Sequence, residues 1–283
     1  MKYPWNDYSR RLSPLKLAVF VALFLPAIWV AAAFALGWLG ARPLNEAIHQ
    51  IGLWTIRLIF VALAITPLRQ IWQWQRLILV RRMVGVAAFA YVLGHFSLYW
   101  VDQAFDVVKI ATEIALRIYL TIGFVALLGL ATLAATSTDG MVRRMGRRWQ
   151  SLHRLIYAIA LLALIHYWMQ SKLDIWEPTI VVGIYIWLMG YRLLLHTVGV
   201  RGRLPLPWVV PLAIAAPLLT AAGEALYFWI GYGVDPMRVL DANLTLQTGL
   251  RPAVIVLGLA VAVTVIAAVR SWSASAKPRP RFA

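Results

Sequence analysis

Five histidines are the residues of this 283-residue chain whose side chains best suit metal chemistry: His49, His95, His153, His166 and His196. Imidazole is the commonest metal ligand among side chains, and it is the usual axial ligand of a haem held without covalent bonds. The chain has no cysteine. This excludes disulfides, thiol catalysis, iron–sulfur clusters, thiolate zinc sites and covalent haem attachment. Which histidines act together depends on the elements that carry them.

The composition predicts a polytopic membrane protein. Hydrophobic residues make up 62% of the chain and charged residues 13%, whereas soluble domains have about 45–50% and about 25%. Eight apolar segments reach the roughly 20 helical residues that cross a bilayer core. They cover about residues 15–37, 45–68, 83–101, 115–136, 152–170, 177–196, 208–231 and 251–269. The first holds an uncharged run longer than the usual signal-peptide core, so we expect a retained helix.

The charges predict which side of the membrane each loop faces. With both chain ends in the cytoplasm, twenty of the 27 lysines and arginines lie at cytoplasmic ends, six lie outside, and Arg57 lies within a span. This asymmetry is typical of inner (cytoplasmic) membrane proteins with an N-in, C-in topology. The cations are spread over five separate cytoplasmic segments, which favours membrane lipid as their partner. We expect no nucleic-acid binding, because no continuous basic groove forms.

The predicted topology gives each histidine a depth. His95 on the third span and His166 on the fifth both lie near the outer face, and this pairing predicts one haem between two imidazoles. His153 lies near the cytoplasmic face, thirteen residues before His166, which corresponds to about 19.5 Å of helix. Thirteen residues also turn a regular helix so that the two side chains point about 140° apart. A second haem on this helix therefore requires a helix irregularity or haems on different sides.

The inner histidine has several possible roles. A repeat of the fifth-span pattern on the third span would place a histidine at Arg81 or Arg82. His153 therefore takes an unusual sixth ligand (His196 or Met83), holds a five-coordinate haem, or serves another cofactor. The chain thus holds one or two haems. His49 and His196 are weaker candidates, because a histidine at a span end is usually an interfacial residue.

Three arginines complete the set of candidate residues. Arg57 lies within the second span, where an uncompensated charge costs about 2.5–3.5 kcal/mol. It contacts a haem propionate or a quinone carbonyl, or alternatively snorkels or pairs with Glu224. Arg147 and Arg148 belong to a cationic run before His153 that suits either a flavin phosphate or anionic lipid. The chain lacks a dinucleotide fingerprint and a soluble domain for NAD(P)H, so electrons must arrive from another molecule.

Several segments, taken in order, resemble a known family. They are Ile65-Thr66-Pro67-Leu68, Arg81-Arg82-Met83-Val84-Gly85, Gly94-His95-Phe96-Ser97-Leu98-Tyr99, Ala135-Thr136-Ser137-Thr138, Trp149-Gln150-Ser151-Leu152-His153-Arg154-Leu155-Ile156-Tyr157 and Ile165-His166-Tyr167. Over about residues 10–196 the chain resembles the MsrQ family, the haem-binding membrane subunits of the periplasmic protein-methionine-sulfoxide reductase system. These subunits belong to the ferric-reductase-like transmembrane cytochromes, which are related to NADPH oxidases.

The resemblance implies a b-type cytochrome with haem ligands His95, His153 and His166. It implies a six-span ferric-reductase-like domain over residues 1–203, followed by two additional helices and a basic cytoplasmic tail over residues 204–283. Electrons would pass from the quinone pool or a cytoplasmic flavin reductase, with FMN as a further cofactor, to a periplasmic molybdenum-dependent methionine sulfoxide reductase. The chain is then an electron-transfer subunit and not the catalytic one. The alternatives are a cytochrome with another partner and a polytopic transporter without haem.

Overall fold

The computed structural model describes residues 5–6, 11–172, 174–200, 202–245 and 249–275. The end of the predicted basic tail, residues 276–283, lies outside this range. Within it, eight segments are long and apolar enough to cross a membrane, which confirms the predicted number. They are Pro14–Ala35, Pro43–Ile71, Gln75–Asp102, Ile118–Ala135, Arg147–Gln170, Trp176–Val198, Leu206–Tyr232 and Pro252–Trp272.

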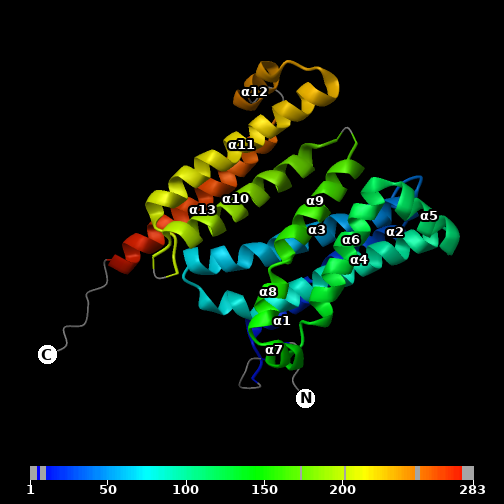
Figure 1. Ribbon diagram of the computed structural model, residues 1–283, viewed down its shortest axis with the longest axis horizontal. Helices are drawn as coiled ribbons and strands as arrows, with labels where there is room; N and C mark the ends of the chain where they lie inside the picture. Colours follow the sequence, from blue (N-terminus) through cyan, green and yellow to red (C-terminus); the bar gives the residue numbers. More distant parts are fainter. Residues whose placement is uncertain (1–4, 7–10, 173, 201, 246–248, 276–283) are drawn as a thin grey trace. The chain divides into compact units, whose positions relative to one another are not determined.

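The described part of the chain is built from α-helices joined by short connections (Figure 1). The first spans are formed by α1 (Pro14–Ala22), α2 (Leu25–Ala35), α3 (Pro43–Ile71), the 3-10 turn η1 (Gln75–Leu77) and α4 (Ile78–Asp102). They are followed by α5 (Val107–Leu116), α6 (Ile118–Ala135), α7 (Asp139–Met145), α8 (Arg147–His153) and α9 (Ile156–Gln170). The last helices are α10 (Trp176–Val198), α11 (Leu206–Tyr232), α12 (Pro236–Leu244) and α13 (Pro252–Ser275).

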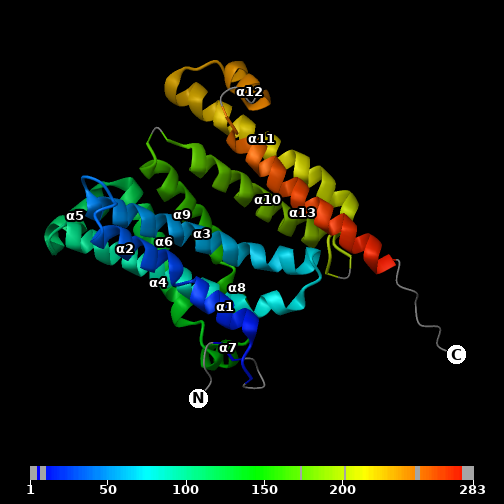
Figure 2. The same cartoon turned by 180° about the vertical axis from the view of Figure 1, so that it is seen from behind.

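The helices form two compact units. The first comprises residues 1–65 and 76–170, and the second comprises residues 66–75 and 171–283. In the first unit α6 packs against α9 and α4, and α5 packs against α6. Figure 2 shows α1 running along α4 on the other side of that helix. In the second unit α10, α11 and α13 pack against one another and α12 packs against α11. The predicted boundary at residue 203 stays a prediction.

The first span is two helices, whereas a single helix over residues 15–37 was expected. Pro26 has no N–H to donate to the preceding turn, which weakens the helix there. The hydroxyl of Tyr91 on α4 enters the gap: it accepts a hydrogen bond from the Ala27 N–H (3.1 Å) and donates one to the Leu23 carbonyl (2.7 Å). These are the two groups that a continuous helix would join directly. The tyrosine therefore bridges the break, as inserted side chains do at helix kinks.

The fifth span is also interrupted, and the break lies between its two histidines. Helix α8 ends at His153 and α9 begins at Ile156, with a turn at Arg154 and Leu155. The angle of about 140° between His153 and His166 assumed one regular helix. The turn interrupts that regular helix, so the angle itself stays a prediction. A helix irregularity was one of the two conditions expected for a second haem on this span, and the break supplies it.

A buried ion pair holds the last helices together. Glu224 on α11 is 3% exposed, and its carboxylate accepts hydrogen bonds from Arg251 Nη2 (2.7 Å) and from Asn243 Nδ2 on α12 (3.0 Å). A buried charge with this set of partners is compensated within its own unit. The two oxygens of Glu224 are thus engaged by Arg251, just before α13, and by Asn243.

Candidate functional site

The rings of His95 on α4 and His166 on α9 face each other. Their centroids lie 6.4 Å apart and their planes are inclined by 81°. Two imidazoles on opposite sides of one transition-metal ion, each bound at about 2 Å, have ring centroids about 6.3 Å apart. The two histidines therefore have the spacing of a pair of axial haem ligands. They come from two different helices of the first unit, as predicted from their depths.

A backbone carbonyl fixes the tautomer of each ring. His95 Nδ1 lies 2.8 Å from the Ile48 carbonyl oxygen on α3, and His166 Nδ1 lies 2.8 Å from the Tyr119 carbonyl oxygen on α6. A carbonyl oxygen only accepts hydrogen bonds, so each Nδ1 carries the proton and donates it. Each Nε2 then keeps its lone pair, which is the arrangement that metal-binding histidines adopt.

A glycine one turn beyond each carbonyl makes room for the ring. A Cβ atom added at Gly52 would lie 3.0 Å from Nδ1 and Cε1 of His95. A Cβ atom added at Gly123 would lie 2.7 Å from Nδ1 of His166. Such contacts are shorter than van der Waals packing allows. A Cβ atom at Gly123 would force the ring of His166 to shift, and one at Gly52 would press on the ring of His95, so both glycines leave space for an imidazole.

The surroundings of the two facing histidines are copies of one arrangement. A carbonyl at Ile48, a glycine four residues later and a histidine 47 residues after the carbonyl form the first set; Tyr119, Gly123 and His166 form the second. The same offset of 71 positions relates each member of one set to its counterpart. Helices α3 and α4 thus correspond to α6 and α9. The repeat places two equivalent imidazoles opposite each other.

A polar network around Glu113 on α5 joins side chains from the end of α4 and the start of α6. Its carboxylate accepts hydrogen bonds from Tyr99 Oη on α4 (3.2 Å) and from Arg117 Nη2 (2.9 Å). Arg117 also donates from Nη1 to Tyr119 Oη (3.1 Å). That hydrogen bond raises the pKa of Arg117 above its ordinary value, so the guanidinium stays charged. The network joins the α4 end beyond His95 to the residue whose carbonyl holds His166.

His153 has a different environment. Its ring stacks on Trp149 with centroids 3.9 Å apart and planes inclined by 24°, and its Nε2 lies 3.1 Å from Thr136 Oγ1. The threonine hydroxyl donates to the Thr132 carbonyl of its own helix (2.9 Å) and so accepts from His153. Nδ1 is then the nitrogen with the lone pair. The guanidinium groups of Arg81 and Arg82 act electrostatically on this ring.

Most of the weaker candidate residues are exposed. His49 is exposed on α3, and His196 is exposed near the end of α10 in the second unit. Arg57 lies over the ring of Trp54 on its own helix, 5.0 Å from the centroid. Arg147 and Arg148 are exposed at the start of α8. The structure thus brings together His95 and His166, and it places the two arginines within a few residues of His153 along one helix. The cofactor roles of all these residues stay predictions.

Comparison with known proteins defines the class first. Residues 51–164 match the family model described as the ferric reductase like transmembrane component. This range contains α4, α6 and most of α3 and α9, and it includes His95 and His153. The first span and the last three spans lie outside it. No solved structure matches the chain significantly. Eight apolar helices and this match define a multi-pass membrane protein of the ferric-reductase-like class.

Curated relatives narrow the class to one family. The chain is 45% identical over 180 residues to the protein-methionine-sulfoxide reductase heme-binding subunit MsrQ of Rhodospirillum rubrum, covering 63% of this chain and 86% of the relative. It is 39% identical over 202 residues to that of Azospira oryzae, covering 70% and 84%. It is 44% identical over 184 residues to that of Xanthomonas campestris pv. campestris, covering 62% and 84%. The chain belongs to the MsrQ family and is a multi-pass protein of the bacterial inner membrane.

Proposed function

We propose that this protein binds haem between His95 and His166 and passes electrons across the inner membrane to a periplasmic methionine sulfoxide reductase. The observation that carries the proposal is the 6.4 Å separation of the two rings, each with its Nδ1 tied to a carbonyl. The bound haem supplies a one-electron couple between ferric and ferrous iron. The relatives, which are named as heme-binding subunits of this reductase, support the assignment.

The protein's own residues hold and orient the cofactor. The Ile48 and Tyr119 carbonyls keep both Nε2 atoms unprotonated, so that each is ready to bind iron without first losing a proton. Gly52 and Gly123 leave space between the helices for the imidazole rings of His95 and His166. The Glu113 network lies at the α4 end beyond His95, which is the predicted periplasmic side where a partner would dock. The residues thus set ligand geometry and access, as a protein does in a cytochrome.

Electrons enter from the cytoplasmic side in this proposal. The donor is the quinone pool or a cytoplasmic flavin reductase, and His153 marks the receiving end as a further haem ligand. FMN binding would use the exposed cations Arg147 and Arg148, since arginine makes strong charge-assisted hydrogen bonds to phosphate. Arg57 serves a haem propionate or a quinone carbonyl. The partner is the catalytic subunit, so this chain performs electron transfer only.

The test is a spectroscopic one on the purified full chain. We expect a red preparation with b-type absorption bands that sharpen on dithionite reduction. Adding a periplasmic methionine sulfoxide reductase should reoxidise the haem only when methionine sulfoxide is also present. A colourless preparation from haem-replete cells would contradict haem binding. Reoxidation that ignores methionine sulfoxide would leave the cytochrome in place but contradict this partner.

A further inference from the structure

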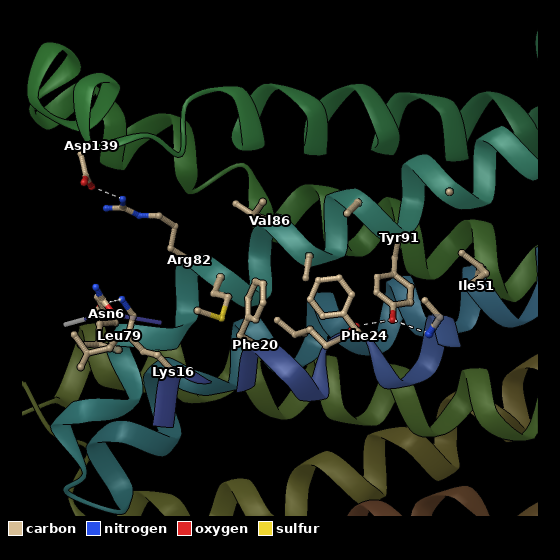
Figure 3. A pocket seen from close by; sticks show the side chains of 17 residues that line it. Asn6, Lys16, Phe20, Phe24, Ile51, Leu79, Arg82, Val86, Tyr91 and Asp139 are labelled. Atoms are coloured by element: carbon tan, nitrogen blue, oxygen red, sulfur yellow. Dashed lines mark hydrogen bonds and ion pairs between the residues drawn. The ribbon is translucent and has the colours of Figure 1, made fainter. Parts of the chain in front are cut away.

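A groove runs along α4 on the side that faces α1 and α2, and it lies wholly within the first unit (Figure 3). Its volume is about 740 Å³, which lies in the range of ligand-binding pockets, roughly 300–1,000 Å³. Figure 3 shows Lys16, Arg82 and Asp139 at one end, Phe20 and Phe24 along the middle, and Tyr91 towards the other end. The cofactor proposal uses none of these residues.

Small side chains on α4 create the space. Ala87, Ala90 and Gly94 line the groove and share one face of the helix, since they are spaced by three and four residues. Phe20 and Phe24 line the opposite wall. Tyr91 holds the kinked first span at a fixed place through its hydrogen bonds to Leu23 and Ala27. The walls are therefore apolar, and the hydrogen bonds of Tyr91 hold the first span at a fixed distance from α4.

The end of the groove at Arg82 is polar and carries excess positive charge. Lys16 and Arg82 are cations, whereas Asp139, which forms an ion pair with Arg82, is the acid among the lining residues. Lys16 Nζ donates to the Asn6 carbonyl (2.7 Å), and an ammonium group has three donors. The distribution of cations places this end at the cytoplasmic face. An anionic group thus fits this mouth better than a neutral one.

The length of the groove requires a long apolar ligand. Arg82 and Gly94 both line the groove, and their separation of twelve positions corresponds to about 18 Å along the helix. This exceeds half of a hydrocarbon core of roughly 30 Å. A free phosphate would fill only the mouth. An apolar molecule without a charged head would leave the excess positive charge at the mouth uncompensated. The occupant has one anionic end at the cytoplasmic interface and a tail that reaches past the bilayer centre.

We propose that the groove binds one anionic phospholipid of the inner leaflet, with its phosphate against Lys16 and Arg82 and an acyl chain along Val86, Ala90 and Gly94. The phosphate takes the charge-assisted hydrogen bonds that lysine and arginine offer. The acyl chain packs against the phenyl rings of Phe20 and Phe24, where less ordered membrane lipid would otherwise lie. This site is separate from the facing histidines, and it does not depend on haem being bound.

The lipid head lies next to the surroundings of the inner histidine. Asp139, which pairs with Arg82, begins helix α7 three residues after Thr136, and Thr136 holds His153. A phosphate at the mouth therefore joins a charged cluster that includes the cytoplasmic end of the predicted electron path.

The test counts lipids on the full chain by native mass spectrometry after extraction in mild detergent. We expect the wild type to retain one phosphatidylglycerol. Ala90→Phe fills the groove from an exposed position and should lower the retained fraction at least about tenfold, since the phenyl ring takes the volume of the acyl chain. Leu93→Phe is the matched control, because Leu93 is 47% exposed on the same helix and does not line the groove. It should retain lipid like the wild type.

A second variant tests the head group without filling the groove. Lys16→Gln should weaken phosphatidylglycerol binding about fivefold, the effect of one interfacial cation. Arg144→Gln, an exposed cytoplasmic cation outside the groove, should have no effect. Equal retention in Ala90→Phe and the wild type would overturn the proposal. So would an uncharged occupant, such as a quinone, that Ala90→Phe removes and Lys16→Gln leaves in place.

Discussion

Helices α3 and α4 correspond to helix α6 and the fifth span, which is formed by α8 and α9, and the two pairs differ at their inner ends. At the outer ends each pair supplies a carbonyl, a glycine and a histidine at matching positions, so that His95 and His166 are equivalent. At the inner ends the same offset of 71 positions aligns Arg82 with His153. One pair therefore offers a cation where the other offers an imidazole.

This difference separates a symmetric site from an asymmetric one. At the proposed outer site a carbonyl accepts from the Nδ1 of each histidine, so that both Nε2 atoms keep their lone pairs. At the inner end, the Nε2 of His153 is engaged by Thr136 and the ring is stacked on Trp149. A metal reaching His153 through Nε2 must displace the threonine. A haem at the proposed outer site would thus use two equivalent imidazoles, whereas one at the inner site would need a rearrangement or a different ligand atom.

The largest effect is expected from removing either outer histidine. His95→Ala and His166→Ala should each lower haem affinity more than about 100-fold, beyond the 10–100-fold loss typical of outer-shell changes at metal sites. The losses should be equal, since the two residues are copies. Haem content per protein and the reduced absorption spectrum measure this. His49→Ala and His196→Ala serve as controls and should keep the wild-type content. Different losses for the two outer variants would break the equivalence.

A smaller effect on haem binding is expected from replacing Gly52 or Gly123, and its size should differ between the two repeats. A Cβ atom at Gly123 meets the ligand ring at 2.7 Å and one at Gly52 at 3.0 Å. Gly123→Ala must therefore displace the imidazole of His166 further, and it should weaken haem binding about tenfold or more. Gly52→Ala should weaken haem binding less. Electron paramagnetic resonance of the oxidised haem would report the tilt of each ligand ring.

Gly129 offers the matched control on the same helix. Its added Cβ would meet Ile159 at 2.8 Å, so Gly129→Ala overpacks the α6–α9 contact by a similar amount without touching a ligand. Such overpacking costs about 1–3 kcal/mol of stability. The variant should melt at a lower temperature and keep the wild-type haem spectrum. If Gly129→Ala and Gly123→Ala changed the spectrum alike, the glycines would matter for helix packing only.

The sequence could predict much of this arrangement. The apolar lengths and the charge asymmetry predicted the eight spans, because membrane thickness constrains helix length directly. The depths of His95 and His166 follow from the same count, and the structure brings their rings together. The sequence could not reveal which carbonyls hold them, since Ile48 and Tyr119 act through backbone atoms. Gly52 and Gly123 were the available signal, because a glycine inside an apolar helix often marks a close approach.

The breaks in the helices were harder to predict. Pro26 gave a local reason for the first, but the insertion of Tyr91 depends on a residue 64 positions away. The turn at Arg154 and Leu155 has no proline or glycine, so tertiary packing decides it. The expected angle between His153 and His166 assumed a regular helix, and side-chain direction along a span can be predicted only where the helix is regular.

His153 should affect the outer haem less than either glycine does. We expect His153→Ala to remove the inner site and to leave the outer haem bound with unchanged ligand signals, because its ring contacts Trp149 and Thr136 and not the outer pair. Thr136→Val keeps the shape of the side chain and removes only the hydroxyl. If Thr136 restrains His153, the valine variant should alter the inner haem spectrum alone. Loss of all haem in His153→Ala would contradict two independent sites.

The smallest effect on haem is expected from the last helices. Arg251→Ala leaves Glu224 with an unpaired buried charge, which costs about 3–5 kcal/mol where one partner of a buried pair is removed. Glu224 lies in the unit formed by residues 66–75 and 171–283, whereas both facing histidines lie in the other. The variant should therefore unfold at a lower temperature and keep the wild-type haem content and spectrum. Glu224→Gln combined with Arg251→Ala removes the charge and should recover part of the stability. A haem spectrum that changed with Arg251→Ala would mean that the two units act as one, and the repeat of α3–α4 and α6–α9 would no longer account for the site alone.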